Sequence, residues 1–174
     1  MHVRRDAQRR DGVDLILEQW SRERPDLDVS PMGVIGRISR LSRIFERGLV
    51  ETFSSFGLGG GEFDVLATLR RAGEPYRLTP TELSKSLMVS SGGMTNRLDR
   101  LERAGFITRL PDPSDRRGTL VCLTDEGRRL VDEVVAAHVE NEHHLLDSLA
   151  PSERKTLADL LRKLLLSLEK DYAP

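Results

Sequence analysis

Residues 90–124 read SSGGMTNRLDRLERAGFITRLPDPSDRRGTLVCLT. The apolar residues of its first half recur at spacings of four and three, as on one side of a helix: Met94, Leu98 and Leu101. Ser90 and Ser91 are residue types that cap the beginning of a helix, and Gly105 is a type that commonly ends one. We therefore expect a helix from Ser90 to Ala104.

Two short runs of β-forming residues follow this helix, at residues 106–110 and 120–123. The segment between them, PDPSDRRG, is rich in turn-forming residues and carries Arg116 and Arg117. A helix followed by an arginine-tipped hairpin is the plan of a winged helix, whose helix enters a major groove of DNA and whose tip reaches a minor groove. An exposed helix and hairpin without a partner would leave the adjacent cations unexplained.

A second, shorter helix is expected just before residue 90. Thr79-Pro80-Thr81-Glu82 has the pattern of a capping box, with proline in the first turn, and predicts a helix ending near Leu87. A short helix, a tight turn and a second helix make a helix-turn-helix. Residues 90–104 then occupy the position of the recognition helix.

The flanking regions are also predicted to be helical. Apolar residues at helical spacing indicate helices at residues 11–24, 32–56, 62–72, 124–148 and 151–170. They carry more apolar surface than a small winged helix can cover, which favours a two-fold dimer over a monomer whose end helices fold back on themselves. The expected fold class is mainly α (α+β): a winged helix-turn-helix with N- and C-terminal dimerisation helices.

The chain is expected to comprise four regions. These are a flexible basic arm at residues 1–10, N-terminal helices for dimerisation and a ligand pocket at 11–56, the DNA-binding domain at 57–128, and C-terminal dimerisation helices at 129–174. Residues 70–129 hold 12 Lys/Arg against 8 Asp/Glu, whereas residues 130–174 hold 5 against 9. A net charge of −1 argues against indiscriminate coating of nucleic acid, but a basic middle region suits a specific reader.

The composition of the chain also limits its expected location and the kinds of function it can have. The single cysteine, Cys122, excludes an intrachain disulfide, and no apolar run resembles a signal peptide or a membrane span, so we expect a cytoplasmic protein. No pattern of an enzyme active site, phosphate loop or nucleotide fingerprint is present, and neither catalysis nor a cofactor is expected. The glycine-rich segment 57–61 follows a helix and is interpreted as a linker.

Residues 78–130, LTPTELSKSLMVSSGGMTNRLDRLERAGFITRLPDPSDRRGTLVCLTDEGRRL, resemble the multiple antibiotic resistance regulator (MarR) family. The resemblance implies a triangular homodimer that binds a pseudo-palindromic operator in double-stranded DNA, usually as a repressor, and often releases it when a small molecule binds. By this likeness Asp115 orients Arg116, and Arg116 enters a narrow A·T-rich minor groove.

The candidate DNA contacts combine both helices and the wing. Thr95 and Asn96 are the candidates for contact with base edges. Thr79, Ser90 and Ser91 are the candidates for contact with phosphates, through their hydroxyl groups and the helix N-termini. The full candidate set is Thr79, Ser90, Ser91, Gly92, Thr95, Asn96, Arg97, Arg100, Asp115, Arg116 and Arg117.

The extra N-terminal helix resembles the urate-responsive branch of the family. The matching ligand contacts are Trp20, Asp64, Arg97 and Arg109. A planar purine anion suits an aromatic wall, a cation and an acceptor for ring N–H groups. Three alternatives remain: Trp20 in an apolar core, an Asp64–Arg97 salt bridge, or Arg97 facing DNA.

Three further interpretations remain open. Zinc sensing would use His138, Glu142, His143 and His144, where His138 and Glu142 share a helix face, although exposed histidines on a dimer helix are the simpler reading. Thiol sensing would use Cys122, which has no basic residue within two positions and is expected to be inert. A winged helix that contacts only proteins is the third.

Overall fold

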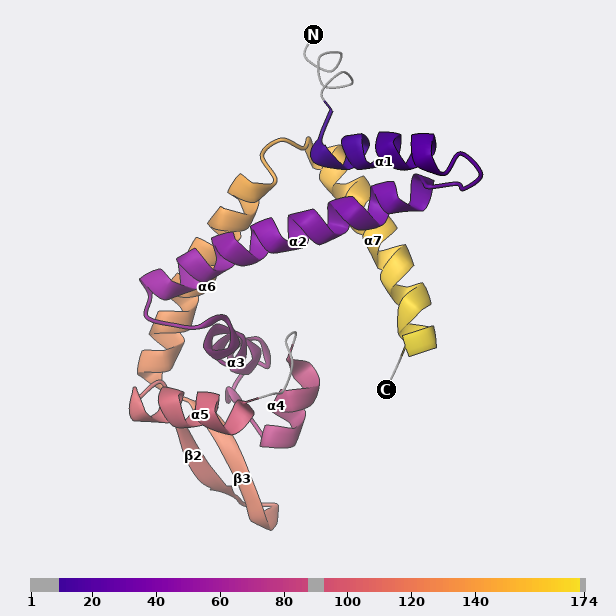
Figure 1. Cartoon of the computed structure of the whole chain (residues 1–174). Coiled ribbons are helices and arrows are strands. Elements are labelled where there is room, and N and C mark those ends of the chain that lie inside the picture. The colour runs from indigo at the N-terminus through magenta and orange to yellow at the C-terminus, as the bar shows by residue number, and fades with distance from the viewer. Residues whose placement is uncertain (1–9, 88–92, 173–174) are drawn as a thin grey trace. The chain divides into compact units, whose positions relative to one another are not determined.

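The computed structural model describes residues 10–87 and 93–172, without the side chains of Arg116, Asp171 and Tyr172 (Figure 1). Two compact units make up the chain, residues 1–48 and residues 49–174. The elements in order are α1 (Gly12–Glu23), α2 (Ser30–Ser55), α3 (Gly60–Arg71), β1 (Arg77–Leu78), α4 (Pro80–Ser86), α5 (Met94–Arg103), β2 (Ile107–Asp112), β3 (Asp115–Leu123), α6 (Asp125–Leu145) and α7 (Pro151–Tyr172). Helices with one small sheet confirm the expected mainly α class.

In the first unit, α1 packs closely on the first half of α2. Asp11 caps α1 by accepting the N–H groups of Val13 and Asp14. Arg37 of α2 then pairs with Asp11 at 2.9 Å and with Asp14 at 2.6 Å. A Cβ added to Gly36 would lie 3.3 Å from Val13 Cγ1, so the two helices approach closely because this position of α2 has no side chain.

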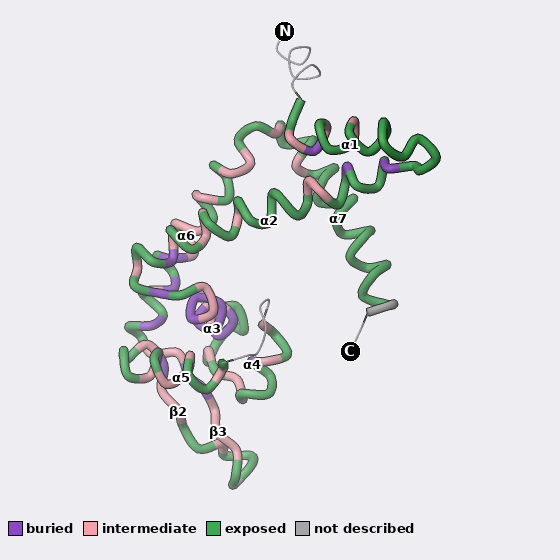
Figure 2. The backbone as a smooth tube through the Cα atoms, viewed as in Figure 1, coloured by how far each residue is buried: buried purple, intermediate pink, exposed green. Residues whose placement is uncertain are grey.

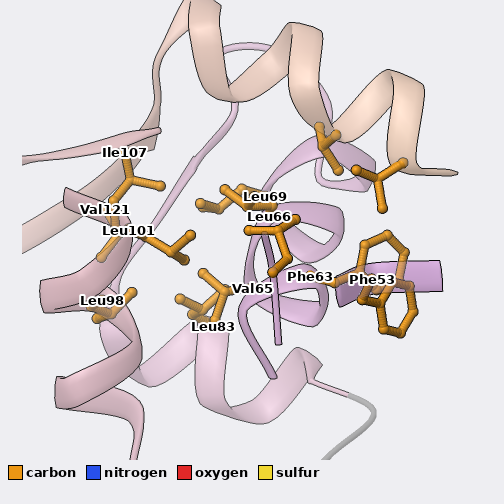
Figure 3. Close-up of a cluster of buried hydrophobic side chains, with 13 residues drawn as sticks. Phe53, Phe63, Val65, Leu66, Leu69, Leu83, Leu98, Leu101, Ile107 and Val121 are labelled. Atoms are coloured by element: carbon orange, nitrogen blue, oxygen red, sulfur yellow. The ribbon is translucent and has the colours of Figure 1, made fainter. Parts of the chain in front are cut away.

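The core of the second unit is centred on α3, which is rich in buried residues (Figure 2). Val65, Leu66 and Leu69 of α3 have no exposed surface. Figure 3 shows side chains from the surrounding helices and strands meeting them: Leu83, Leu98, Leu101, Ile107 and Val121. Burial of these residues fixes α4, α5 and the sheet against α3, and the hydrophobic effect supplies most of that stability.

The sheet has three antiparallel strands in the order β1-β3-β2. β2 and β3 form the wing, with Ile107 opposite Leu123 and Leu110 opposite Leu120. β1 was not predicted, since two residues carry no detectable alternation. The wing turn is shorter than expected: only residues 113–114 form it, and residues 115–118 of the anticipated turn belong to β3.

The helix-turn-helix has the expected order but a different beginning for its second helix. The capping box of α4 is confirmed, because Thr79 Oγ1 accepts from Glu82 N–H at 3.2 Å and Glu82 Oε2 accepts from Thr79 N–H at 2.9 Å. α5 begins at Met94 rather than Ser90, directly after Gly93 at φ 75°, a left-handed conformation that glycine adopts without strain. Ser90 and Ser91 lie outside the described residues.

The C-terminal helices follow the wing as predicted. Thr124 caps α6 by accepting from Gly127 N–H at 3.0 Å, while its hydroxyl donates to Gly105 O at 2.8 Å. α7 leaves several leucines exposed: Leu157, Leu160, Leu161, Leu164, Leu165, Leu166 and Leu168. Within residues 10–87 and 93–172, no helix is both long and apolar enough to cross a membrane.

Candidate nucleic-acid interface

The two sides of α5 differ sharply in chemistry. Leu98 and Leu101 are buried against α3, whereas the opposite side is polar and cationic. A shallow hollow of about 470 Å³ lies on that side, lined by Gly93, Asn96, Arg97, Asp99, Arg100 and Arg103. Three guanidinium groups and one amide around a concave surface provide donors for base edges and charge for phosphates.

The beginning of α3 holds two of these arginines. Arg100 Nε lies 2.7 Å from Glu62 Oε1, and the side chain of Glu62 is only 11% exposed. The side chain of Arg97 lies over Gly61, where an added Cβ would stand 2.4 Å from Arg97 Nε. The first turn of α3 therefore contacts α5 in two ways: Glu62 forms an ion pair with Arg100, and Gly61 leaves room for the side chain of Arg97.

The wing is joined to α5 by a third arginine. Arg109 of β2 lies 2.7 Å from Asp99 Oδ1 and 3.1 Å from Glu102 Oε2. The backbone N–H of Arg109 also donates to Glu102 Oε1 at 3.0 Å. These bonds connect β2 to the helix beside it, so the wing and α5 are linked by side chains as well as by the chain itself.

The wing turn is organised by two aspartates. Asp112 Oδ1 accepts from the N–H and hydroxyl of Ser114 at 2.8 and 2.7 Å. Asp115 is exposed, and its Oδ1 accepts from the backbone N–H of Arg117 at 3.0 Å. Asp115 therefore orders the backbone beside Arg116, whose own backbone lies in β3. Arg117 is exposed.

The other candidate DNA contacts fall on α4 and α5. Thr95 and Asn96 are exposed on α5, and Thr79 is half-buried in the capping box of α4. Ser90, Ser91 and Gly92 lie outside the described residues. The candidate DNA contacts that the structure describes in the helix-turn-helix therefore lie on α5 and at the N-cap of α4.

The candidate ligand contacts occupy both units. Trp20 lies on α1 and is 43% exposed, so the first unit does not bury it in a core. In the second unit, Asp64 is buried on α3, while Arg97 and Arg109 are half-buried. Arg109 is engaged by two carboxylates, an arrangement that the sequence did not reveal.

The histidines of α6 do not converge on one point. His138 packs against the rings of Phe53 and Phe63, with centroids 5.4 and 5.1 Å apart, so the expectation that it is exposed is wrong. Its Nε2 lies 3.3 Å from Glu142 Oε1, as their spacing predicted. His143 and His144 instead contact Arg154 and Asp147. Among the described residues, no three His, Cys, Asp or Glu side chains form a group suited to a metal.

Cys122 lies in β3, as predicted. It is buried, and burial raises the pKa of its thiol, although the charge of Arg77 opposes this. Arg77 is the residue paired with Cys122 across β1 and β3. A basic neighbour therefore exists in space although the adjacent sequence has none, and the desolvation of the thiolate is the larger effect.

Comparison with known proteins extends these observations. The model of the MarR family matches residues 60–119. The HTH-type transcriptional regulator PecS of Dickeya dadantii is 48% identical over 149 residues, which are 86% of this chain and 90% of PecS.

Two solved structures are also similar. A crystal structure of a cysteine-to-serine mutant of MarR from Escherichia coli, complexed with operator DNA, has 34% identity and a TM-score of 0.66, covering 78% of this chain and 94% of that one. A structure of Bordetella bronchiseptica BpsR concerns the mechanism by which 6-hydroxynicotinic acid regulates its DNA binding; it has 27% identity and a TM-score of 0.66, covering 76% and 98%.

A helix-turn-helix whose second helix presents arginines, followed by a β-hairpin wing, defines a winged-helix DNA-binding protein. Its relatives are transcriptional regulators and not enzymes, and this chain is assigned to the same class. The identity to PecS and MarR over most of the chain identifies the protein further: it belongs to the MarR family of transcriptional regulators.

Proposed function

We propose that this regulator is a homodimeric repressor that reads a pseudo-palindromic operator and releases it when a small organic anion binds. The cationic hollow on α5 is the observation that carries this proposal, because it sets Asn96 beside the guanidinium groups of Arg100 and Arg103 on an exposed helix face. Such a face matches the major groove, and the wing beyond it suits a neighbouring minor groove.

The exposed leucines support dimerisation through the ends of the chain. Leu160, Leu165 and Leu166 of α7 are each more than half exposed, as are Val34 and Ile35 of α2. Exposed apolar side chains in such numbers are costly in water and commonly lie in an isologous interface. A dimer with two winged helix-turn-helix domains would recognise a palindrome, since each domain binds one half-site.

In this proposal, release of the operator begins at Arg109. By the family resemblance the ligand contacts are Trp20, Asp64, Arg97 and Arg109, and urate or a related purine fits their chemistry. An anion that binds Arg109 competes with Asp99 and Glu102, and so weakens the bonds between β2 and α5. The regulation of BpsR by 6-hydroxynicotinic acid provides a precedent in a related fold for control by a planar heterocyclic acid.

Operator binding is tested with duplexes from beside the chromosomal gene. Arg116→Ala should weaken binding by roughly 1–3 kcal/mol while the fold is kept. Arg24→Ala, which removes an exposed arginine of the first unit paired with Asp26, is the control and should bind normally. Affinity should fall steeply with salt, since each phosphate contact releases counterions. Failure to bind any duplex at low ionic strength would refute the proposal.

Ligand release is tested separately on the preformed operator complex. Urate or xanthine at millimolar concentration should dissociate it, whereas caffeine, which is neutral and lacks ring N–H donors, should not. Trp20→Leu should bind operator as the wild type does but respond less to urate, because it removes the aromatic wall and changes no residue of α5 or the wing. Equal responses of Trp20→Leu and wild type would exclude Trp20 from the ligand site.

A further inference from the structure

The carboxylate of Glu62 has two different tasks, one on each oxygen. Oε2 accepts the N–H of Gly59 at 2.7 Å and so caps the beginning of α3. Oε1 lies 2.7 Å from Nε of Arg100 on α5. One side chain therefore joins the end of a core helix to an arginine on the exposed face of the helix expected to read DNA.

The pair is asymmetric in exposure. The side chain of Glu62 is 11% exposed, whereas that of Arg100 is 59% exposed. The buried partner is held by its helix cap, so it acts as a fixed anchor for the more exposed one. The closest contact is made by Nε of Arg100, and no second carboxylate within the described part of the chain forms an ion pair with this guanidinium.

From this geometry we infer that Glu62 is a positioning residue for base recognition: it orients Arg100 so that its two terminal nitrogens read a guanine in the major groove. Guanine presents O6 and N7 as paired acceptors, which match two parallel N–H donors. A long side chain that is already oriented loses less conformational entropy on binding than a mobile one. The inference rests on the proposed function, since it takes α5 to be the helix that reads bases.

The decisive variant is Glu62→Gln. Glutamine also serves in a capping box, so its amide oxygen can keep the bond from Gly59, but the negative charge that attracts Arg100 is lost. Glu82→Gln is a matched control: Glu82 caps α4 in the same way, loses the same charge, and in the described residues has no arginine within ion-pair distance.

The measurement is the base preference at every operator position, obtained by selecting randomised duplexes with the full-length protein. Arg100→Ala first identifies the position where preference for guanine is lost. Glu62→Gln should reduce preference at that same position by roughly two- to ten-fold, the range expected when one long side chain must be ordered on binding. Glu82→Gln should leave every preference unchanged. Glu62→Gln in the Arg100→Ala background should change nothing further.

Each other outcome overturns a defined claim. If Glu62→Gln has the wild-type profile, changes a different position or binds operator more tightly, Glu62 does not position Arg100 for reading. If Arg100→Ala alters no position, Arg100 does not read a base, although DNA binding stands. If wild type selects no sequence at all, the proposed function itself fails. A uniform loss with a lower melting temperature would mean that Glu62 has only a structural role.

Discussion

Nη2 of Arg109 on β2 lies 2.7 Å from Oδ1 of Asp99 on α5, so an ion pair joins a strand of the wing to the helix expected to read DNA. Glu102, three residues further along α5, accepts from the backbone N–H of the same arginine, and its Oε2 lies 3.1 Å from the guanidinium Nη1. This arrangement fixes the angle between wing and helix, which matters because the two elements are expected to contact neighbouring grooves of one duplex.

Glu102→Ala should increase the local mobility of the wing and lower the stability of the fold only modestly. It removes one hydrogen bond to an ionised acceptor and one partly exposed ion pair, which together predict a loss of about 1–2 kcal/mol in the free energy of unfolding. Amide exchange of Arg109 should accelerate, because its N–H loses its acceptor. Urea titration and exchange mass spectrometry measure the two effects. Asp159→Ala on α7 is the control; unchanged exchange across β2 in Glu102→Ala would contradict the prediction.

Gly127→Ala should destabilise the second unit strongly. A Cβ at this position would lie 2.0 Å from the backbone oxygen of Phe106, and backbone cannot move aside as a side chain can. Overpacking of this kind costs about 1–3 kcal/mol, and the upper end is expected here. Gly60→Ala is the matched control, because its nearest neighbour is an atom of Phe53 at 3.8 Å. Equal urea midpoints for the two variants would refute the contact.

Cys122 should react slowly with thiol reagents in the folded protein. Only the thiolate is nucleophilic, and burial raises the pKa of Cys122 above its ordinary value, so little thiolate is present near neutral pH. Labelling with a chromogenic disulfide should be slow in buffer and fast in urea, and peroxide should not alter operator binding. Labelling at the same rate in both solvents would show that the thiol is accessible in the native state.

Glu82 should contribute stability that is lost in acid. The hydrogen bonds from the N–H and hydroxyl of Thr79 hold the pKa of Glu82 below its ordinary value of 4.5. The folded state therefore favours the ionised form, and the contribution is complete above that value and disappears as the pH falls through the lower, folded pKa. Glu82→Gln should thus be less stable than wild type near neutral pH and converge with it in acid. Glu51→Gln, at an exposed position of α2, is the control; a gap that stays constant with pH would contradict the prediction.

The helices and their caps were predictable because their signals are local. The stripe of Met94, Leu98 and Leu101 and the Thr79–Glu82 capping box each lie within a few residues, where one element determines the pattern. The turn of the wing was located less well, since PDPSDRRG offers several turn-forming pairs, and only the bonds from Ser114 to Asp112 select one.

The contacts that organise the interface were not predictable in the same way. Glu62 and Arg100 are far apart in sequence and meet only because α3 and α5 pack together. No periodicity connects such positions. The acidic residues Asp99 and Glu102, which alternate with the arginines of α5, were the available signal that one side of this helix would neutralise a cation of the adjacent strand.

Trp20 is the only tryptophan in the sequence, and it lies on α1 in the first unit. Native emission therefore reports on the surroundings of one N-terminal helix, whereas far-ultraviolet circular dichroism reports on helices throughout the chain. Melting curves from the two signals coincide if both units lose structure in a single cooperative step and separate if they do not. The molecule thus carries an intrinsic probe that tells the melting of one unit from that of the whole, without any added dye.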